Sequence, residues 1–379
     1  MIYPRVYCNE KGHVCQATVG EGEINAAATM TALVLSAKFD LRGTYFLFAG
    51  IAGVNPRHAT LGSVALARYA VQVALQYEID ARSLPEYQDT DAASSAAEGD
   101  KKASQWPSGY FAYGTDYPLE YPSITYGTEV FELNAKLRDM AYSWSSRSNL
   151  SDAETTREYR QLYRSPTDEE EESNEEGEDV NPFAAAVGPP LVVRCDTATS
   201  DVYYSGTLLA SAFEKTTEVW TNGTGVYCMT AQEDNANLEV MVRAAIEGLV
   251  DFSRIMVMRT GSNFDRPPPG MSDWEHLVVS HQNGFDIAID NIYNAGIAVV
   301  RGILNGWECG LADGVPPDNY IGDIFGSLGG EPDFGLGSIT GGLPVAPDGG
   351  GISRQDEAVL ERREMSRRVN LGRRGLVKV

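Results

Sequence analysis

Polar side chains that could hold a small ligand come at the ends of two predicted buried strands of this sequence. Arg259, Asn263 and Asp265 end or follow an apolar stretch over 252–260, where buried polar groups need either backbone partners or a ligand. Glu233 opens a predicted helix, where a carboxylate either interacts with the helix N-terminus or accepts hydrogen bonds from two neighbouring ligand hydroxyls. These residue types indicate a site for a hydroxyl-bearing molecule.

Two glycine segments could bring a ligand close to the backbone. The run Thr44–Ile51 predicts a buried strand, followed by a glycine turn over Gly50–Gly53 and a further turn at Asn55-Pro56. The segment Gly20–Asn25 precedes a predicted alanine-rich helix, and its free N–H groups could hold an anion or a hydroxyl. The alternative for this second segment is a tight strand-to-helix connection without a ligand.

The elements that must position these residues alternate between strands and helices. Apolar alternation predicts a hairpin around Gly12. Further strands are predicted over 44–51, 62–77 (one or two strands), 191–196 and 252–260, and helices over 26–36, 128–145, 207–216, 233–250 and 285–304. This alternation predicts an α/β fold with a central sheet covered on both faces. Ligands of such sheets collect at the carboxyl ends of the strands.

Charge and composition divide the chain. The net charge of −23 argues against binding nucleic acid, which needs clustered Lys and Arg. An acidic linker over 165–190 is expected to be disordered, and residues 84–122 are expected to form a long irregular insertion. One domain is therefore predicted over 1–315, followed by a disordered tail over 316–379.

Few features of the sequence indicate the cellular compartment of the protein. Five cysteines and two glycosylation sequons favour a secretory origin over the alternative, a reduced cytosolic protein. Cys8 and Cys15 flank the predicted hairpin turn, so a disulfide between them is sterically reasonable. No stretch reads as long and apolar enough to span a bilayer, and no metal-ligand pattern occurs. The segment Met1–Pro4 resembles the middle of a domain, which predicts a truncated N-terminus.

Eight motifs occur in a characteristic order along residues 7–315. They are GEGEINAAAT, YFLFAGIAGVNP, ARYAVQVALQYEIDAR, YGTEVFELN, CDTATSDVYYSG, TNGTGVYC, AQEDNA and RTGSNFDRPPPG. In this order they resemble the purine nucleoside permease family, within the nucleoside phosphorylase and nucleosidase superfamily. The resemblance implies a nucleoside phosphorylase-like mixed central sheet flanked by helices, a purine nucleoside as ligand, no cofactor, and a homo-oligomer.

The resemblance also implies roles for particular residues. Glu233 would hold the ribose 2′- and 3′-hydroxyls, and Tyr203 would stack on the base unless it is a core tyrosine. Asn263 stands where the superfamily carries an Asp that protonates the base. An amide can donate a hydrogen bond but not a proton, so Asp265 would be the substitute acid. The remaining residues expected to contact substrate are Asn25, Gly50, Ile51, Ala52, Gly53, Asp201, Gln232 and Arg259.

The nucleophile is predicted to be water. A phosphorylase needs cationic and hydroxyl ligands beside the glycine turn, where this chain has Leu47, Phe48 and Ile51. Glu21 and Glu23 could each orient the water, and Glu21 is preferred because it lies between two glycines. Both could instead be dipole partners of the helix.

The leading hypothesis is therefore hydrolytic cleavage of a purine nucleoside. A nucleoside-binding component of uptake without catalysis, and a phosphate-dependent phosphorylase, are the alternatives.

Overall fold

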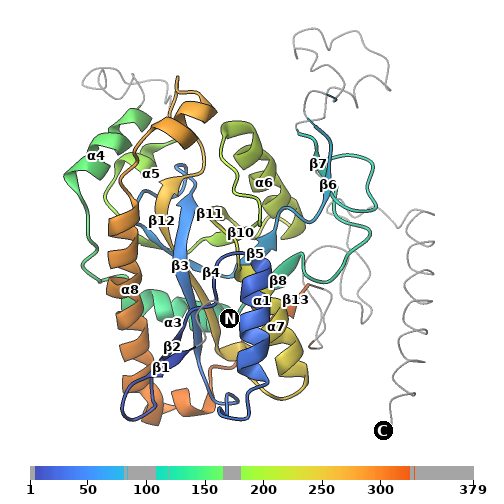
Figure 1. Ribbon diagram of the computed structural model, residues 1–379, viewed down its shortest axis with the longest axis vertical. Coiled ribbons are helices and arrows are strands. Elements are labelled where there is room, and N and C mark those ends of the chain that lie inside the picture. Colours follow the sequence, from blue (N-terminus) through green and yellow to red (C-terminus); the bar gives the residue numbers. More distant parts are fainter. Residues whose placement is uncertain are drawn as a thin grey trace.

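A mixed sheet of nine strands runs through the part of the chain that this computed structural model describes, residues 5–80, 83, 108–118, 120–164, 181–324 and 328 (Figure 1). From edge to edge the strands are β13 (Gly322–Asp323), β8 (Val130–Glu132), β5 (Tyr69–Gln72), β10 (Asp196–Thr199), β11 (Tyr227–Ala231), β3 (Phe46–Val54), β12 (Ile255–Phe264), β4 (Val64–Ala67) and β9 (Val192–Val193). β3 lies parallel to β12 and antiparallel to β11, whereas β12 lies antiparallel to β4.

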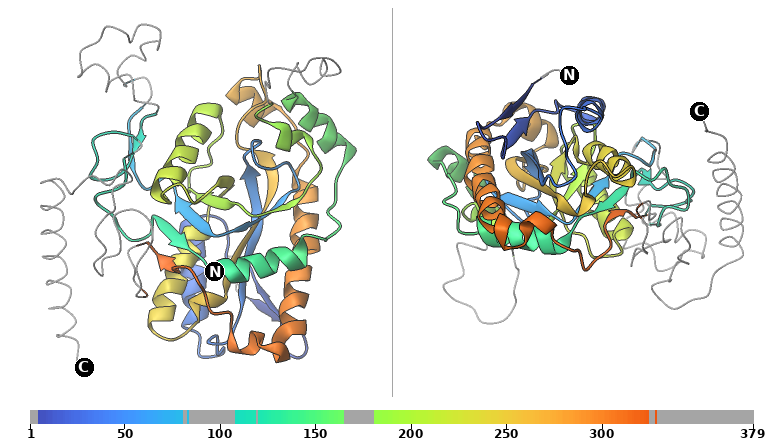
Figure 2. Two further views of the ribbon diagram at one scale, coloured as in Figure 1. Left: turned by 180° about the vertical axis from the view of Figure 1, so that it is seen from behind. Right: turned by 90° about the horizontal axis from the view of Figure 1, so that it is seen from below.

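Helices cover both faces of the sheet (Figures 1 and 2). They are α1 (Glu23–Val34), α3 (Ala135–Ser145), α4 (Glu154–Arg160), α5 (Ala184–Val187), α6 (Thr207–Trp220), α7 (Asp234–Ile246) and α8 (Phe285–Gly306). The side chains of β12 alternate between two cores: Val257 packs with α1 and α7, whereas Met256 and Met258 pack with α3 and α8. The predicted α/β fold with a mixed central sheet flanked by helices is confirmed.

The glycine segment lies inside a strand, so the predicted glycine turn over Gly50–Gly53 is wrong. β3 continues through both glycines to Val54 and pairs with β12 along its whole length, with one register shift near Gly261. The chain turns only at Asn55, whose backbone N–H donates to the Cys228 carbonyl at 2.8 Å. Glycine permits an extended backbone as readily as a turn, and sequence alone did not separate the two.

The predicted helix over 128–145 is divided in two. Its first part is β8, which pairs with β5, and its second part is α3. Asn134 separates them because its side-chain oxygen accepts a hydrogen bond from the Leu137 N–H at 3.2 Å and caps α3. The stretch over 62–77 forms two strands of the main sheet, as one of the two predicted options stated.

The predicted hairpin near the N-terminus is present. β1 (Val6–Cys8) pairs with β2 (Cys15–Ala17) in a separate two-stranded sheet, and a disulfide joins Cys8 to Cys15. A second disulfide joins Cys195, directly before β10, to Cys228 in the neighbouring strand β11. α1 begins three residues before the predicted start, so Glu23 lies in its first turn.

Among the described residues, one helix is long and apolar enough to cross a membrane by length and composition, Phe285–Cys309. The expectation that no such stretch exists is therefore wrong. A third of that window is buried, 33%, and α8 packs on β12 and β3 as core helices also do. Length and composition alone therefore assign no membrane span.

Most of the expected irregular segments lie outside the described residues. These are residues 1–4, nearly all of the insertion between 81 and 107, the linker over 165–180, and the tail after 324 apart from residue 328. From the described part of the insertion, β7 (Tyr110–Phe111) pairs with β6 (Tyr77–Glu78). Beyond residue 315, β13 pairs with β8 and adds a strand to the main sheet.

Candidate ligand-binding site at the start of two helices

The N-termini of α1 and α7 meet at one group of carboxylates. The Gly22 N–H donates to Glu233 Oε1 at 3.1 Å, and the Glu23 N–H donates to Asp201 Oδ1 at 2.8 Å. The side-chain amide of Gln72 donates to the Glu23 carboxylate. Helix N-termini favour negative charge because their first N–H groups have no partner within the helix. The structure therefore brings the predicted Glu233 and Asp201 together with Glu23.

A buried guanidinium ties this group to the central sheet. Arg259, on β12, contacts Asp234 Oδ1 at 2.5 Å and Glu233 Oε2 at 3.1 Å through Nη2, and its Nη1 donates to the Ile51 carbonyl at 3.3 Å. Burial alone would lower the pKa of Arg259, but the charges of Asp234 and Glu233 outweigh that effect and raise it. Arg259 therefore stays charged and fixes one oxygen of Glu233.

We call these five residues the α1–α7 cluster: Glu23, Asp201, Glu233, Asp234 and Arg259. Asp234 is fully buried and was not predicted from the sequence, although it directly follows Glu233 in the AQEDNA motif. Its burial beside a guanidinium marks it as a structural support of the site rather than a ligand contact.

The glycines of β3 make room for this cluster. A Cβ on Gly50 would lie 2.5 Å from Arg259 Nη1, so any side chain there displaces the guanidinium. A Cβ on Gly53 would collide with the Thr230 hydroxyl, which accepts the Gly53 N–H at 3.0 Å. Asn263 lies beside the same glycine. The glycines thus accommodate side chains of the protein itself, which the sequence analysis had not foreseen.

Negative charge exceeds positive charge in the α1–α7 cluster. Burial, together with the charges of Asp201 and Glu233, raises the pKa of Glu23 to about 7, and the hydrogen bond from Gln72 opposes this only in part. A carboxyl group with such a pKa can accept or release a proton near neutral pH. The structure thus places Glu23, the less preferred of the two sequence candidates, inside the cluster.

Several other predicted residues lie around the cluster without entering it. The Glu21 side chain is exposed, and its carbonyl accepts from Asn25 Nδ2 at 2.7 Å. Gln232 donates to the Asp201 carbonyl at 3.1 Å. Tyr203 is 58% exposed, so it is not the core tyrosine that was the alternative to base stacking. Ala52 is buried in β3.

The apolar residues near the glycines belong to the cores. Leu47 packs on the side of α3 and α8, and Phe48 packs on the side of α1 and α7. Their apolar character follows from burial of a central strand on both faces. It therefore carries no information about whether phosphate or water would bind nearby.

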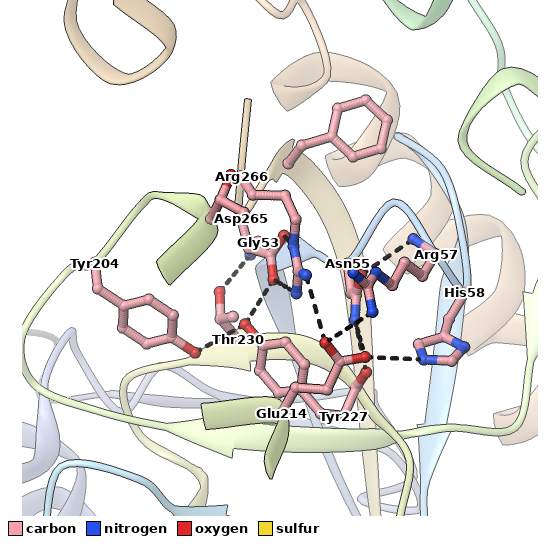
Figure 3. Close-up of polar contacts among 12 residues, drawn as sticks. Gly53, Asn55, Arg57, His58, Tyr204, Glu214, Tyr227, Thr230, Asp265 and Arg266 are labelled. Atoms are coloured by element: carbon pink, nitrogen blue, oxygen red, sulfur yellow. Dashed lines mark hydrogen bonds and ion pairs between the residues drawn. The ribbon is translucent and has the colours of Figure 1, made fainter. Parts of the chain in front are cut away.

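Asp265 belongs to a second, separate group of charges, drawn in Figure 3. Its carboxylate accepts from the Tyr227 hydroxyl at 2.7 Å and from Arg266 Nε and Nη2 at 2.9 and 3.1 Å. Only 1% of Asp265 is exposed, and none of Arg266. Both oxygens of this carboxylate are thus engaged by side chains of the protein, in a group separate from the α1–α7 cluster, so the geometry does not support the predicted role of Asp265 as an acid.

This group continues to the surface through Glu214. The Glu214 carboxylate lies 3.4 Å from Arg266 Nη1 and 3.7 Å from both Arg57 and His58. Burial would raise the pKa of Glu214, but the hydrogen bond from His58 and the charges of Arg266 and Arg57 lower it to about 2. We call Asp265, Tyr227, Arg266, Glu214, Arg57 and His58 the Asp265 network.

The side-chain amide of Asn263 offers a hydrogen-bond donor beside β3. Its Nδ2 donates to the Phe264 carbonyl at 3.3 Å, and its Oδ1 accepts from the Ser262 hydroxyl at 3.0 Å. An amide nitrogen has two N–H groups, so one remains for a ligand acceptor. This agrees with hydrogen bonding to a base and not with proton transfer.

The structure is an α/β protein in which the α1–α7 cluster is a candidate site lined by carboxylates. A sequence profile described as purine nucleoside permease matches residues 1–316. A purine nucleoside permease of Candida albicans is 43% identical over 341 residues, which cover 89% of this chain and 76% of the relative. A probable purine nucleoside permease of Schizosaccharomyces pombe is 40% identical over 310 residues, covering 81% and 80%. The chain belongs to the purine nucleoside permease family.

Solved structures overlap with this fold at low similarity. One is a 5′-methylthioadenosine/S-adenosylhomocysteine nucleosidase from Neisseria meningitidis in complex with methylthio-immucillin-A, with 11% identity and a TM-score of 0.38, over 76% of this chain and 80% of that one. Another is a futalosine hydrolase of Helicobacter pylori, with 11% identity and a TM-score of 0.39, over 79% and 82%. Overlap at these TM-scores carries no conclusion about activity.

Proposed function

We propose that this protein binds a purine nucleoside at the α1–α7 cluster and hydrolyses its N-glycosidic bond. The observation that carries the proposal is the position of Glu233, which is fixed on one oxygen by the Gly22 N–H and on the other by Arg259. The names of the relatives support a purine nucleoside as the ligand.

Glu233 has the acceptor capacity that a ribose needs. A carboxylate has about four lone-pair positions, and the two contacts from the protein use one on each oxygen. The remaining positions can accept the 2′- and 3′-hydroxyls together. A preorganised carboxylate of this kind binds two vicinal hydroxyls with little loss of side-chain entropy.

Glu23 is the group that we assign to the attacking water. In its ionised form it accepts a proton from water while the water oxygen bonds to C1′ of the ribose and the bond from C1′ to the base breaks. The base leaves with the electron pair of that bond and takes its proton from solvent, with Asn263 donating a hydrogen bond to it. Water is the only co-reactant of this step.

A second candidate function is binding without turnover, as a component of nucleoside uptake. Its specific support is that neither Asn263 nor Asp265 can act as a proton donor in this arrangement: the first is an amide and the second is paired with Arg266. The relatives are named as permeases, which agrees with this alternative.

One experiment separates these functions. The protein is incubated with adenosine, inosine or guanosine, with and without inorganic phosphate, and the free base is measured by chromatography beside calorimetric binding. Free base without phosphate, lost in Glu233→Gln, supports hydrolysis. Strict phosphate dependence makes the protein a phosphorylase, and tight binding without free base supports uptake. Absence of both binding and turnover would refute the site.

We also infer a homo-oligomer, as the family resemblance implies. Helix α8 presents an apolar stripe to solvent, made of Phe285, Ile289 and Tyr293, which are 58%, 47% and 66% exposed and lie four residues apart. Light scattering after size exclusion should give a mass above that of one chain. The charged variant Ile289→Asp should shift the mass to that of one chain.

A further inference from the structure

The side chain of Gln72 is a buried polar group beside the α1–α7 cluster. Gln72 is the last residue of β5, and 6% of it is exposed. β5 runs parallel to β10, and Gln72 pairs with Thr199, which precedes Asp201 by two residues. Because neighbouring parallel strands end at the same edge of a sheet, Gln72 reaches the cluster from the strand next to the one that leads to Asp201.

The orientation of the Gln72 amide is set by its two partners. The Ala74 N–H donates to Gln72 Oε1 at 2.8 Å. A backbone N–H can only donate, so the side-chain atom that faces Ala74 must be the oxygen. The amide nitrogen then faces Glu23, to whose carboxylate it donates. In this orientation Gln72 is a hydrogen-bond donor to Glu23 and cannot accept a proton from it.

The main chain at Gln72 is tied to the start of α7. The Gln72 N–H donates to the Glu129 carbonyl at 2.7 Å, and Asn235 Nδ2 donates to the same carbonyl at 3.2 Å. The Glu129 carboxylate accepts the backbone N–H groups of residues 126–128 at distances of 2.6, 2.8 and 3.0 Å. Asn235 follows Glu233 by two residues, so these bonds hold Gln72 in place relative to the helix that carries Glu233.

The charged groups around Glu23 belong to elements other than α1. They are Asp201 after β10, Glu233 and Asp234 at the start of α7, and Arg259 on β12. Burial and the charges of Asp201 and Glu233 raise the pKa of Glu23, whereas the hydrogen bond from Gln72 lowers it. Gln72 is thus an uncharged side chain that opposes the effect of the neighbouring carboxylates.

We propose that Gln72 is a positioning residue, which orients the Glu23 carboxylate and favours the ionised form that accepts a proton from the attacking water. The role of Glu23 as a base rests on the proposed function, whereas the hydrogen bond rests on the contacts of Gln72 alone. An ionised acceptor makes a stronger hydrogen bond than a neutral one, so a fixed donor stabilises the carboxylate over the protonated acid.

This role requires no proton from Gln72 itself. Water gives its proton to Glu23 while the water oxygen bonds to C1′ of the ribose, and the Gln72 amide keeps both of its hydrogens throughout. What Gln72 determines is the pH above which Glu23 is free to accept that proton. It therefore sets the lower pH limit of the reaction.

Titration of Glu23 in the full chain tests the hydrogen bond directly. The protein is labelled with carbon-13 at its glutamate side-chain carboxyl groups, and the NMR resonance that Glu23→Gln lacks reports Glu23. The pH midpoint of this resonance should rise by about one pH unit in Gln72→Met, because a hydrogen bond to an ionised group favours that form roughly tenfold.

A second variant guards against misfolding of Gln72→Met. Gln72→Asn keeps an oxygen that can accept the N–H two residues on, as asparagine does in Asx turns, but its shorter side chain withdraws the nitrogen from Glu23. It should raise the pH midpoint of Glu23 in the same direction.

Gln76→Met is the matched control. Gln76 is 7% exposed, and its Nε2 donates to the Val73 carbonyl at 2.6 Å and to Thr216 Oγ1 at 3.4 Å. The variant therefore removes a similarly buried amide whose hydrogen bonds go elsewhere, and it should leave the midpoint of Glu23 unchanged. Under the proposed function, the rise of kcat/KM with pH should move with the midpoint in Gln72→Met and stay in place in Gln76→Met.

An unchanged midpoint in both Gln72 variants, or an equal rise in Gln76→Met, would overturn the proposal. A midpoint that rises while the pH dependence of kcat/KM stays in place would overturn the role of Gln72 in the reaction. The NMR titration is read without nucleoside. A raised midpoint in a protein that releases no free base would therefore refute the hydrolysis and leave the hydrogen bond standing, which keeps the two failures distinct.

Discussion

Two groups of charged side chains, the α1–α7 cluster and the Asp265 network, differ in how well their charges are balanced. The α1–α7 cluster sets four carboxyl groups against the guanidinium of Arg259, and the pKa of Glu23 rises to about 7. The Asp265 network sets two carboxylates against Arg266, Arg57 and His58, and the pKa of Glu214 falls to about 2. Unbalanced charge is costly for folding, and under the proposed function the hydroxyl donors of a ligand would reduce that cost in the α1–α7 cluster.

The largest expected effect is on stability, from the Asp265 network. Arg266→Met removes the guanidinium but keeps the volume, and it leaves Asp265 as an unpaired buried charge. Removing one partner of a buried pair costs about 3–5 kcal/mol. Urea denaturation should therefore show a free energy of unfolding lower by this amount.

The matched control for this variant is Arg57→Ala. Arg57 also contacts Glu214, but its side chain is 44% exposed, and exposed pairs contribute about 0–1 kcal/mol. If Arg266→Met were no more destabilising than Arg57→Ala, the buried charges of the Asp265 network would not stabilise the fold by balancing one another.

The next largest effect is on nucleoside binding, and it is expected in the α1–α7 cluster instead of the Asp265 network. Glu233→Gln keeps the shape of the side chain but removes the charge that would accept two ribose hydroxyls. Hydrogen bonds to charged groups are worth about 1.5–3 kcal/mol each, so the nucleoside Kd should rise roughly 10- to 100-fold or more. Titration calorimetry with inosine measures it.

Glu214→Gln provides the counterpart of this substitution. It should lower the unfolding free energy and leave the Kd unchanged, because the polar contacts of Glu214 within the described part of the chain are with the Asp265 network and Asn55. If Glu233→Gln and Glu214→Gln weakened nucleoside binding equally, the α1–α7 cluster and the Asp265 network would not differ in their role in binding.

Much of the fold was predictable because local patterns agree with it. The long apolar-faced helices α6, α7 and α8, and the turn around Gly12, carry strong periodic or turn signals in the sequence. The exceptions have a common cause. The start of β8 and the glycines of β3 are decided by tertiary partners, namely pairing with β5 and the position of the Arg259 guanidinium, which no local pattern reports.

That some of the candidate residues would lie together was predictable from the sequence, whereas their role as a site stays a prediction. Glu233, Asp201 and Arg259 come together, and their motifs were sufficient to select them. Asp234 and the preference for Glu23 over Glu21 were not accessible, because they depend on which side of α1 and α7 faces the other helix. The pairing of Asp265 with the adjacent Arg266 likewise becomes visible only once both are known to be buried.

A smaller effect is expected where the cluster meets β3. Gly50→Ala places a Cβ 2.5 Å from Arg259 Nη1, so the guanidinium must shift away from Glu233. Overpacking of this kind costs about 1–3 kcal/mol, and loss of the Glu233 contact should weaken nucleoside binding as well. Gly43→Ala is the control, because its Cβ would meet nothing within 4 Å. Unchanged binding in Gly50→Ala would show that Arg259 does not position Glu233.

The smallest effect, a change in pH dependence, tests directly whether the α1–α7 cluster is unbalanced. The pKa of Glu23 is raised from its ordinary value of 4.5 to about 7 in the folded protein, so this group favours folding below pH 4.5 and loses that contribution as the pH rises through 7. Glu23→Gln cannot ionise and should be increasingly more stable than the unchanged protein between pH 5 and 8.

Denaturation at several pH values measures this difference. Glu21→Gln is the control, because the Glu21 side chain is exposed and lies outside the cluster, and its difference from the unchanged protein should stay flat. If the protein hydrolyses nucleosides, kcat/KM should rise through the same pH range, since only the ionised Glu23 accepts a proton from water, and Glu23→Gln should remove the rise. If the stability difference of Glu23→Gln stays flat with pH, further groups must balance the negative charge of the α1–α7 cluster. Charge balance would then not distinguish this cluster from the Asp265 network.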